Sequence, residues 1–141
     1  PTSESDYDPA VISPMERFLA DLKVLIETKR KDPDVLTEAV ARLRRKLSDS
    51  DNDIIETVFD LGFLPLLVQL LYDSDELPRL QMEVAWCITN MTAGTRDQTM
   101  AVVQSGVLPK CVASIAVNLS VGMWTLMSLV SCVVTVPLTS P

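Results

Sequence analysis

Two stretches of the chain share one pattern: an apolar helix-forming run, a glycine, two apolar residues, a proline and a second apolar run. The stretches are "VFDLGFLPLLVQLL" (58–71) and "AVVQSGVLPKCVAS" (101–114), with Gly62 matching Gly106 and Pro65 matching Pro109 at an offset of 44 residues. Glycine ends a helix in the left-handed conformation, and proline is suited to the first turn of the next helix. A period in the forties, built from one short and two longer helices, predicts an α-solenoid.

The rest of the chain extends this repeat with further helices. Apolar residues at spacings of three and four predict helices over residues 15–28, 33–47 and 79–91. Asp32 or Asp34 would cap the second of these, with Pro33 in its first turn. No strand-like alternation competes before residue 110. We therefore expect an all-α solenoid of about two and a half to three repeats.

Composition excludes several classes of protein. With 141 residues, 48% of them hydrophobic, the chain can bury the core of one domain. A net charge of −7 argues against nucleic-acid binding, which depends on neutralising phosphates. Histidine is absent and the three cysteines form no paired motif, so zinc sites, disulfide frameworks and Ser-His or Cys-His nucleophiles are not expected. We expect no enzyme, no cofactor and no metal.

The helix expected over residues 79–91 carries its largest apolar side chain outside its core-facing stripe. The stripe consists of Leu80, Val84, Cys87, Ile88 and Met91. At about 100° per residue, Trp86 points about 110° away from the centre of this stripe. Asn90 lies one turn above Trp86, with Glu83 between them in angle. This flank therefore either packs on a neighbouring helix or belongs to a binding surface.

The stretch "ELPRLQMEVAWCITNMTAGT" (76–95), preceded by "GFLPLLVQLL" (62–71), resembles an armadillo repeat. More narrowly, it is similar to the importin-α family of adaptors for basic nuclear localisation signals. The resemblance covers roughly residues 34–115. Trp86-x-x-x-Asn90 followed by Gly-Thr-x-x-Gln-Thr (94–99) favours this family over the catenin type. The matching residues are Gln81, Glu83, Ala85, Trp86, Thr89, Asn90, Gly94, Thr95, Gln98 and Thr99.

The resemblance implies a peptide groove lined by the third helices of successive repeats. Asn90 would hold the backbone of an extended peptide with its amide donor and acceptor. Trp86 would flank the aliphatic stem of a lysine, with a cation–π contribution of roughly 0.5–2 kcal/mol. The Gly94 carbonyl and the Thr99 hydroxyl would accept from the lysine ammonium, and Glu83 on the rim would attract a basic peptide. One Trp/Asn pair gives only a weak site.

Each of these residues also has a structural interpretation. Trp86 could pack on a neighbouring helix, Asn90 could end its own helix, and Thr99 could cap the next one. Acidic residues such as Glu83 are most often solvated. The basic runs "KRK" (29–31) and "RLRRK" (42–46) resemble a bipartite localisation signal, but we interpret them as solvated helix surface.

The chain departs from the family pattern on both sides of this stretch. Ser48 in "RKLSD" (45–49) matches the loop that starts the groove, but an aspartate follows it where a basic residue is expected. The next tryptophan, Trp124, has Ser128 instead of asparagine four residues on. Trp86 follows Pro65 by 21 residues, whereas Trp124 follows Pro109 by only 15. We include Ser48, Trp124 and Ser128 as weaker candidates for peptide binding.

The last thirty-one residues, 111–141, contain no charged side chain. Residues 119–138 have about the length of a membrane span, although their serines, threonines and late proline make their hydrophobicity moderate. A shifted reading frame would also produce such an abrupt change of composition. The interpretation we favour is a degenerate last repeat with an exposed apolar end.

The predicted organisation follows from these features. We expect a disordered acidic tail at 1–13, a partial repeat at 14–49, a complete repeat at 50–95, a degenerate repeat at 96–134 and a C-terminal tail at 135–141. The chain begins at Pro1 without methionine, which suggests processing or cutting from a longer chain. Residues 1–13 hold no basic residue that could form the family's importin-β-binding segment.

The expected function is that of a nuclear import adaptor that binds basic, Lys/Arg-rich peptide or protein cargo in the cytoplasm and nucleus. A transport receptor of the importin-β type is expected as a partner only of a longer form. The first alternative is a generic armadillo scaffold that binds another protein. A helical protein anchored in a membrane through residues 119–138 is the less favoured alternative.

Overall fold

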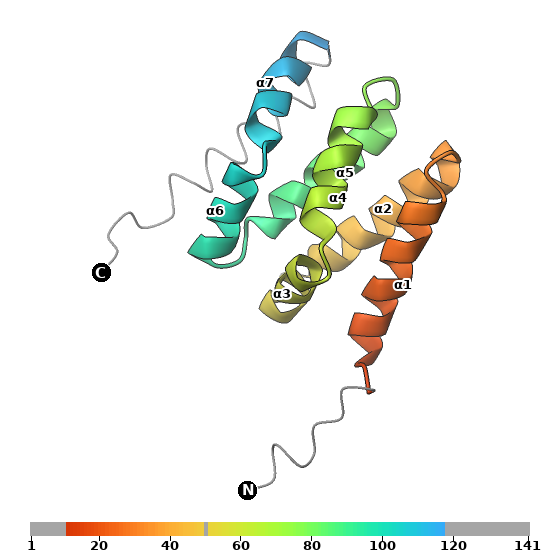
Figure 1. The fold of residues 1–141 in the computed structure, drawn as a ribbon, viewed down its shortest axis with the longest axis vertical. Coiled ribbons are helices and arrows are strands. Elements are labelled where there is room, and N and C mark those ends of the chain that lie inside the picture. Colours follow the sequence, from red (N-terminus) through yellow and green to blue (C-terminus); the bar gives the residue numbers. More distant parts are fainter. Residues whose placement is uncertain (1–10, 50, 118–141) are drawn as a thin grey trace, which may run out of the picture.

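The computed structural model describes residues 11–49 and 51–117. Within these ranges the chain forms seven α-helices joined by short turns (Figure 1). They are α1 (Pro14–Thr28), α2 (Pro33–Leu47), α3 (Asn52–Asp60), α4 (Phe63–Asp73), α5 (Pro78–Met91), α6 (Arg96–Gln104) and α7 (Val107–Val117). The expected all-α solenoid is confirmed.

The first two helices begin at capping residues that the sequence provides. The Ser13 hydroxyl accepts a hydrogen bond from the Glu16 backbone N–H at the start of α1, at 3.1 Å. The Asp32 carboxylate accepts from the Val35 N–H at the start of α2, at 3.3 Å. Both helices open with a proline, whose missing N–H costs no helical hydrogen bond in the first turn. Asp32, and not Asp34, is therefore the cap of α2.

The repeat predicted from the two Gly-x-x-Pro stretches is present in the helices. Helix α6 begins at Arg96, 44 residues after the start of α3 at Asn52. Helix α7 begins at Val107, 44 residues after the start of α4 at Phe63. Gly62 and Gly106 both adopt left-handed backbone conformations, with φ of 81° and 93°. Side chains rarely tolerate this conformation, so glycine lets each short helix turn directly into the next.

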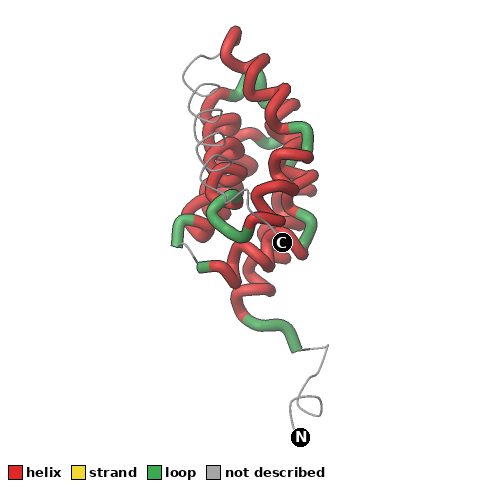
Figure 2. The backbone as a smooth tube through the Cα atoms, turned by 90° about the vertical axis from the view of Figure 1, so that its left-hand side faces the viewer, coloured by secondary structure: helices red, strands yellow, loops and turns green. Residues whose placement is uncertain are grey.

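The helices are arranged in layers. In Figure 1, α1 and α4 lie in front of α2 and α5, and the helices follow one another across the view from α1 on the right to α6 and α7 on the left. Figure 2 shows the same helices turned by 90°. The interior between them is apolar: Leu19, Val40, Leu43, Phe63, Leu67, Val84 and Ile88 are fully buried. The Cys87 thiol, also buried, donates to the Val40 carbonyl at 3.5 Å and joins α5 to α2. Parallel stacking of α2 on α5 brings the equivalent helices of two repeats together.

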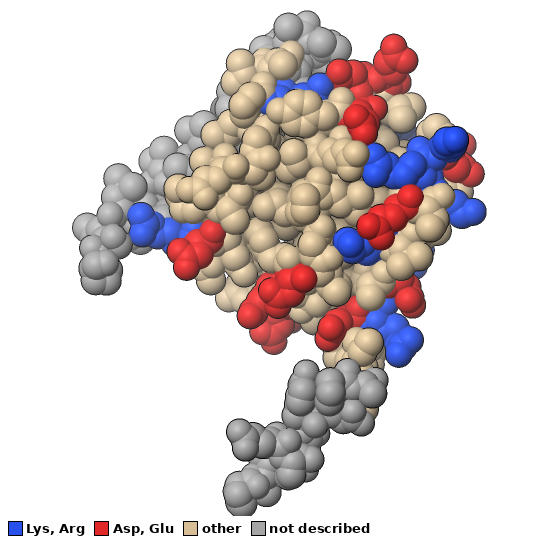
Figure 3. Space-filling model, viewed as in Figure 1, with Lys and Arg blue, Asp and Glu red and all other residues tan. Residues whose placement is uncertain are grey.

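Charged side chains of both signs gather along α1 on the face shown in Figure 3, while the middle of that face is uncharged. Three ion pairs among the described residues connect elements that are distant in sequence, one of them between Arg44 and Glu83. Arg30 pairs with Asp73 at 3.1 Å, and Lys110 pairs with Asp75 at 2.5 Å. The Lys110–Asp75 pair joins α7 to the loop between α4 and α5, and so attaches the last described helix to the complete repeat.

Within residues 11–49 and 51–117, no single helix is both long and apolar enough to cross a membrane. The pair α3 and α4 meets the length and composition criteria only together, and the two are bent by 77° at their junction. The predicted span at 119–138 lies outside the described residues, as do residues 1–10 of the predicted tail 1–13 and the whole of the tail at 135–141.

Candidate functional site

Helix α5 presents its candidate residues on the flank that faces α2. Its stripe is buried as predicted: Leu80, Val84, Cys87, Ile88 and Met91 are each at most 2% exposed. Glu83, Trp86 and Asn90 are half-buried beside this stripe. The off-stripe flank of α5 is therefore neither core nor fully solvated.

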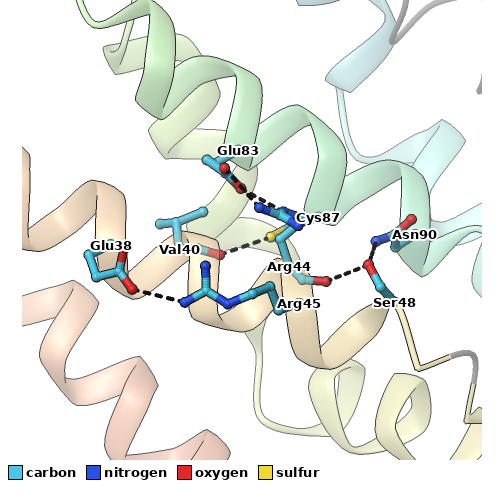
Figure 4. A network of polar contacts seen from close by, with 8 residues as sticks. All are labelled: Glu38, Val40, Arg44, Arg45, Ser48, Glu83, Cys87 and Asn90. Carbon is cyan, nitrogen blue, oxygen red and sulfur yellow. Dashed lines mark hydrogen bonds and ion pairs between the residues drawn. The ribbon is translucent and has the colours of Figure 1, made fainter.

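Arg44 on α2 contacts two of these three side chains. Its guanidinium donates to the Glu83 carboxylate from Nε at 2.8 Å and from a terminal nitrogen at 3.2 Å (Figure 4). The same group lies over the Trp86 ring, with Cζ 4.2 Å from the ring centroid. Glu83 was predicted to be a solvated or groove-rim residue. Instead its carboxylate is held in a two-point ion pair within the chain.

The third side chain, Asn90, is connected to Arg44 through a serine. The Asn90 amide nitrogen donates to the Ser48 hydroxyl at 3.1 Å, and that hydroxyl donates to the Arg44 carbonyl at 2.9 Å (Figure 4). Ser48 was predicted from its place in the loop after α2, and the structure brings it directly to Asn90. We call Arg44, Ser48, Glu83, Trp86 and Asn90 together the α2–α5 surface.

The electrostatics of this surface are dominated by the ion pair. The hydrogen bond that Arg44 donates to Glu83 raises the pKa of Arg44 above its usual value, so the guanidinium stays charged. Because Glu83 balances Arg44, the two contribute no net charge to the surface. Burial raises the pKa of the Cys87 thiol well above its ordinary value, which keeps it protonated and unreactive as a thiolate.

A groove of about 530 Å³ continues from this surface along the first halves of α2 and α5. Its charged lining residues are Asp34, Glu38, Arg79 and Glu83. Glu38 already pairs with Arg45 at 2.8 Å on the exposed side of α2. The groove and the α2–α5 surface thus meet at Glu83.

The Gly-Thr-x-x-Gln-Thr stretch forms the start of α6. The Thr95 hydroxyl accepts from the Gln98 N–H at 3.2 Å, and the Gln98 side-chain oxygen accepts from the Thr95 N–H at 2.9 Å, forming a capping box. The cap is therefore Thr95, and Thr99 was the wrong residue for that structural role.

Gly94 and Thr99 differ in exposure. Gly94 is half-buried, and a Cβ at this position would lie 1.9 Å from the Gln98 side-chain oxygen. Thr99 is 1% exposed, and its hydroxyl contacts the carbonyls of Thr92 and Thr95 at 3.0 and 3.1 Å. Thr99 therefore lines no open surface in this structure. Trp124 and Ser128 lie outside the described residues.

Arg44 is the residue of the α2–α5 surface that was not expected from the sequence, because the run 42–46 was interpreted as solvated helix surface. A signal for it exists in the spacing. Arg44 precedes Trp86 by 42 residues, as Ser48 precedes Asn90. Because α2 and α5 run parallel and both separations are 42 residues, the Arg44–Trp86 and Ser48–Asn90 contacts lie one helical turn apart.

Comparison with known proteins agrees with the helical repeat. Residues 51–93 match the family of Armadillo/beta-catenin-like repeats. Importin subunit alpha-B of Dictyostelium discoideum is 35% identical over 85 residues, 60% of this chain and 16% of the relative. Importin subunit alpha-6 of Arabidopsis thaliana is 36% identical over 97 residues, 68% of this chain and 18% of the relative. Importin subunit alpha-3 of Caenorhabditis elegans is 44% identical over 72 residues, 51% of this chain and 14% of the relative.

The chain thus spans less than a fifth of the length of these curated relatives. The matches agree with the two observations made above, namely the three-helix repeat and the Trp/Asn pair on its last helix. The chain thus contains an armadillo-type helical repeat and is similar to part of the importin α subunits.

Proposed function

We propose that the chain is an adaptor that binds basic peptides of the nuclear localisation type on the α2–α5 surface. The observation that carries this proposal is the placement of Trp86 and Asn90 one turn apart on the half-buried flank of α5, within an armadillo repeat. Importin α subunits among the relatives support the same class of partner. A cytoplasmic and nuclear location is part of this proposal.

Asn90 would bind the peptide backbone. Its amide nitrogen is directed at Ser48, and a primary amide keeps a second N–H and a carbonyl oxygen for a peptide group. Gly94, half-buried at the end of the same flank, would offer its carbonyl to a lysine ammonium. Thr99 would act indirectly, by holding the start of α6, because its side chain is buried.

The expected affinity is low. One Trp/Asn pair gives one peptide-binding unit, and a Kd of about 0.1–1 mM corresponds to only about 4–5.5 kcal/mol of binding free energy. Trp124 and Ser128, outside the described residues, would add a second unit only if they form a comparable pair. A receptor of the importin-β type would bind a longer form of the chain.

The test is a titration with a peptide of five consecutive lysines, read by the fluorescence of Trp86 in a Trp124→Phe background. We expect saturable quenching, and Asn90→Ala should weaken binding several-fold. A peptide with glutamine at each lysine should not bind. Gln69→Ala, on the exposed side of α4, is the matched control and should bind as the parent does. Absence of any saturable signal at millimolar peptide would rule out the adaptor function.

A second candidate is a scaffold that binds another protein without recognising basic peptides. The contact of Arg44 with Trp86 favours it, because a guanidinium of the chain itself already covers one face of the indole. The groove lined by Asp34, Glu38 and Arg79 would then be the contact surface. Binding of a protein partner that is unaffected by Trp86→Ala but lost in Arg79→Glu would support this candidate.

A further inference from the structure

We propose that Arg44 is a positioning residue of the α2–α5 surface, which holds the Trp86 indole and the Asn90 amide in the arrangement that a peptide binds. This inference deepens the proposed function and rests on it. Three independent contacts of the one residue support it.

The first two contacts belong to the guanidinium. It binds both carboxylate oxygens of Glu83 at 2.8 and 3.2 Å while lying over Trp86 at 4.2 Å. A planar guanidinium can donate in its plane and stack on an aromatic face at the same time, which an ammonium cannot do. Glu83 therefore fixes Arg44, and Arg44 in turn limits the orientations of the indole.

The third contact uses the Arg44 main chain. Its carbonyl accepts from the Ser48 hydroxyl at 2.9 Å, and this hydroxyl accepts from Asn90 at 3.1 Å. With its proton directed at the Arg44 carbonyl, the Ser48 oxygen is left as an acceptor and selects the nitrogen of the Asn90 amide. The carbonyl oxygen of Asn90 is thereby directed away from Ser48, as a peptide N–H would require.

Burial separates this arrangement from an ordinary surface ion pair. The Arg44 and Glu83 side chains are 19% and 18% exposed, whereas Arg45 and Glu38, on the same helix, are 52% and 65% exposed. Figure 4 shows the two pairs side by side. Arg44 is held in one geometry, and Arg45 lies on the solvated surface.

A peptide that binds Trp86 and Asn90 together gains affinity when both side chains are already ordered. Without the Arg44 side chain, binding has to order the Trp86 indole, which costs affinity, whereas the link from the Arg44 carbonyl through Ser48 to Asn90 remains. We expect Arg44→Met, which keeps the apolar stem, to weaken peptide binding about three- to tenfold. Arg45→Met removes the same charge from the next position and is the matched control. Loss of a positive charge alone would leave a basic peptide bound equally well or slightly more tightly.

The experiment measures two quantities in a Trp124→Phe background: the Kd for the five-lysine peptide, and the quenching of Trp86 fluorescence by acrylamide. Arg44→Met should raise the quenching and the Kd, and Arg44→Lys should raise both because an ammonium cannot make both contacts. Arg45→Met should change neither. Ser48→Ala, at an exposed position, should raise the Kd and leave the quenching of Trp86 unchanged.

If Arg44→Met binds the peptide as tightly as Arg45→Met or more tightly, the inference is overturned. Equal binding would mean that Arg44 has no effect on the peptide, and tighter binding that Arg44 competes with it. If Arg44→Met does not fold, as judged by circular dichroism, Ser48→Ala and Arg44→Lys decide the question in the same way. If the parent chain itself binds no peptide, the proposed function fails and the inference fails with it. Binding by the parent with no effect of these variants overturns the inference alone.

Discussion

The guanidinium of Arg44 lies over the indole ring of Trp86, with Cζ 4.2 Å from the ring centroid. This contact explains why α5 carries its largest apolar side chain away from its core stripe. The indole packs on a residue of the neighbouring repeat and yet stays half-exposed. The two interpretations of the off-stripe tryptophan, packing and binding surface, are therefore compatible at this position.

Breaking the Arg44–Glu83 pair should destabilise the protein. Both side chains are more than four-fifths buried, so Glu83→Gln removes a charge-assisted hydrogen bond that water replaces only in part. We expect a loss of about 1–2 kcal/mol in the free energy of unfolding, measured by urea denaturation.

The control for this loss is Glu38→Gln, which removes the same charge from the exposed pair with Arg45. We expect a change below about 0.5 kcal/mol, because exposed ion pairs contribute little to stability. Equal effects of the two variants would show that the burial of Glu83 does not strengthen its ion pair.

Local signals were enough to predict the helices and the repeat. Periodicity gave the core faces, and Asp32, Pro33, Gly62 and Gly106 mark helix boundaries by their own backbone chemistry. The contacts of the candidate site could not be predicted in this way. They depend on how α2 lies against α5, which is a tertiary register. For this reason Ser48 was expected from its loop position, whereas its bond to Asn90 and the role of Arg44 were not.

The stretch that follows Asn90 shows a second limit of sequence reasoning. Gly94, Thr95, Gln98 and Thr99 match a family pattern as a group, so a shared binding role was expected for two of them. In the structure Thr95 and Gln98 form the capping box of α6, and Thr99 is buried under it. A sequence can match a family motif because the motif starts a helix. The burial of each side chain is needed to distinguish this structural role from a role in binding.

Gly94→Ala should destabilise the start of α6. The new Cβ would lie 1.9 Å from the Gln98 side-chain oxygen and 3.1 Å from Ile55 Cγ2. The Gln98 side chain would have to leave the Thr95 N–H, so we expect a loss of about 1–2 kcal/mol. In a double-mutant cycle, Gly94→Ala should cost clearly less when Gln98→Ala is already present. Additive losses would show that the clash is not with Gln98.

Gly62→Ala and Gly106→Ala should cost similar amounts. Both glycines have left-handed backbones, and an added Cβ meets nothing closer than Lys23 Cε at 3.9 Å at Gly62 and nothing within 4 Å at Gly106. Only backbone strain remains, which is about 1–2 kcal/mol for an L-residue. Asparagine tolerates this conformation better, so Gly62→Asn should cost less than Gly62→Ala in urea denaturation. A loss well above this range would indicate a steric clash instead of strain.

The Lys110–Asp75 pair should make stability fall in acid. The hydrogen bond from Lys110 is the main reason why the pKa of Asp75 lies below its ordinary value of 3.8. A lowered native pKa stabilises the folded chain above the unfolded pKa, and this contribution is lost as the pH falls through the native value. We therefore expect the difference in unfolding free energy between the parent and Asp75→Asn to be constant from about pH 5 to 7 and to shrink below about pH 4. Thermal unfolding in a series of buffers measures it. In Lys110→Met the same substitution should lose this pH dependence, since the remaining hydrogen bond from Gln81 lowers the pKa of Asp75 by less than burial raises it. A pH dependence that survives in Lys110→Met would assign it to other carboxylates.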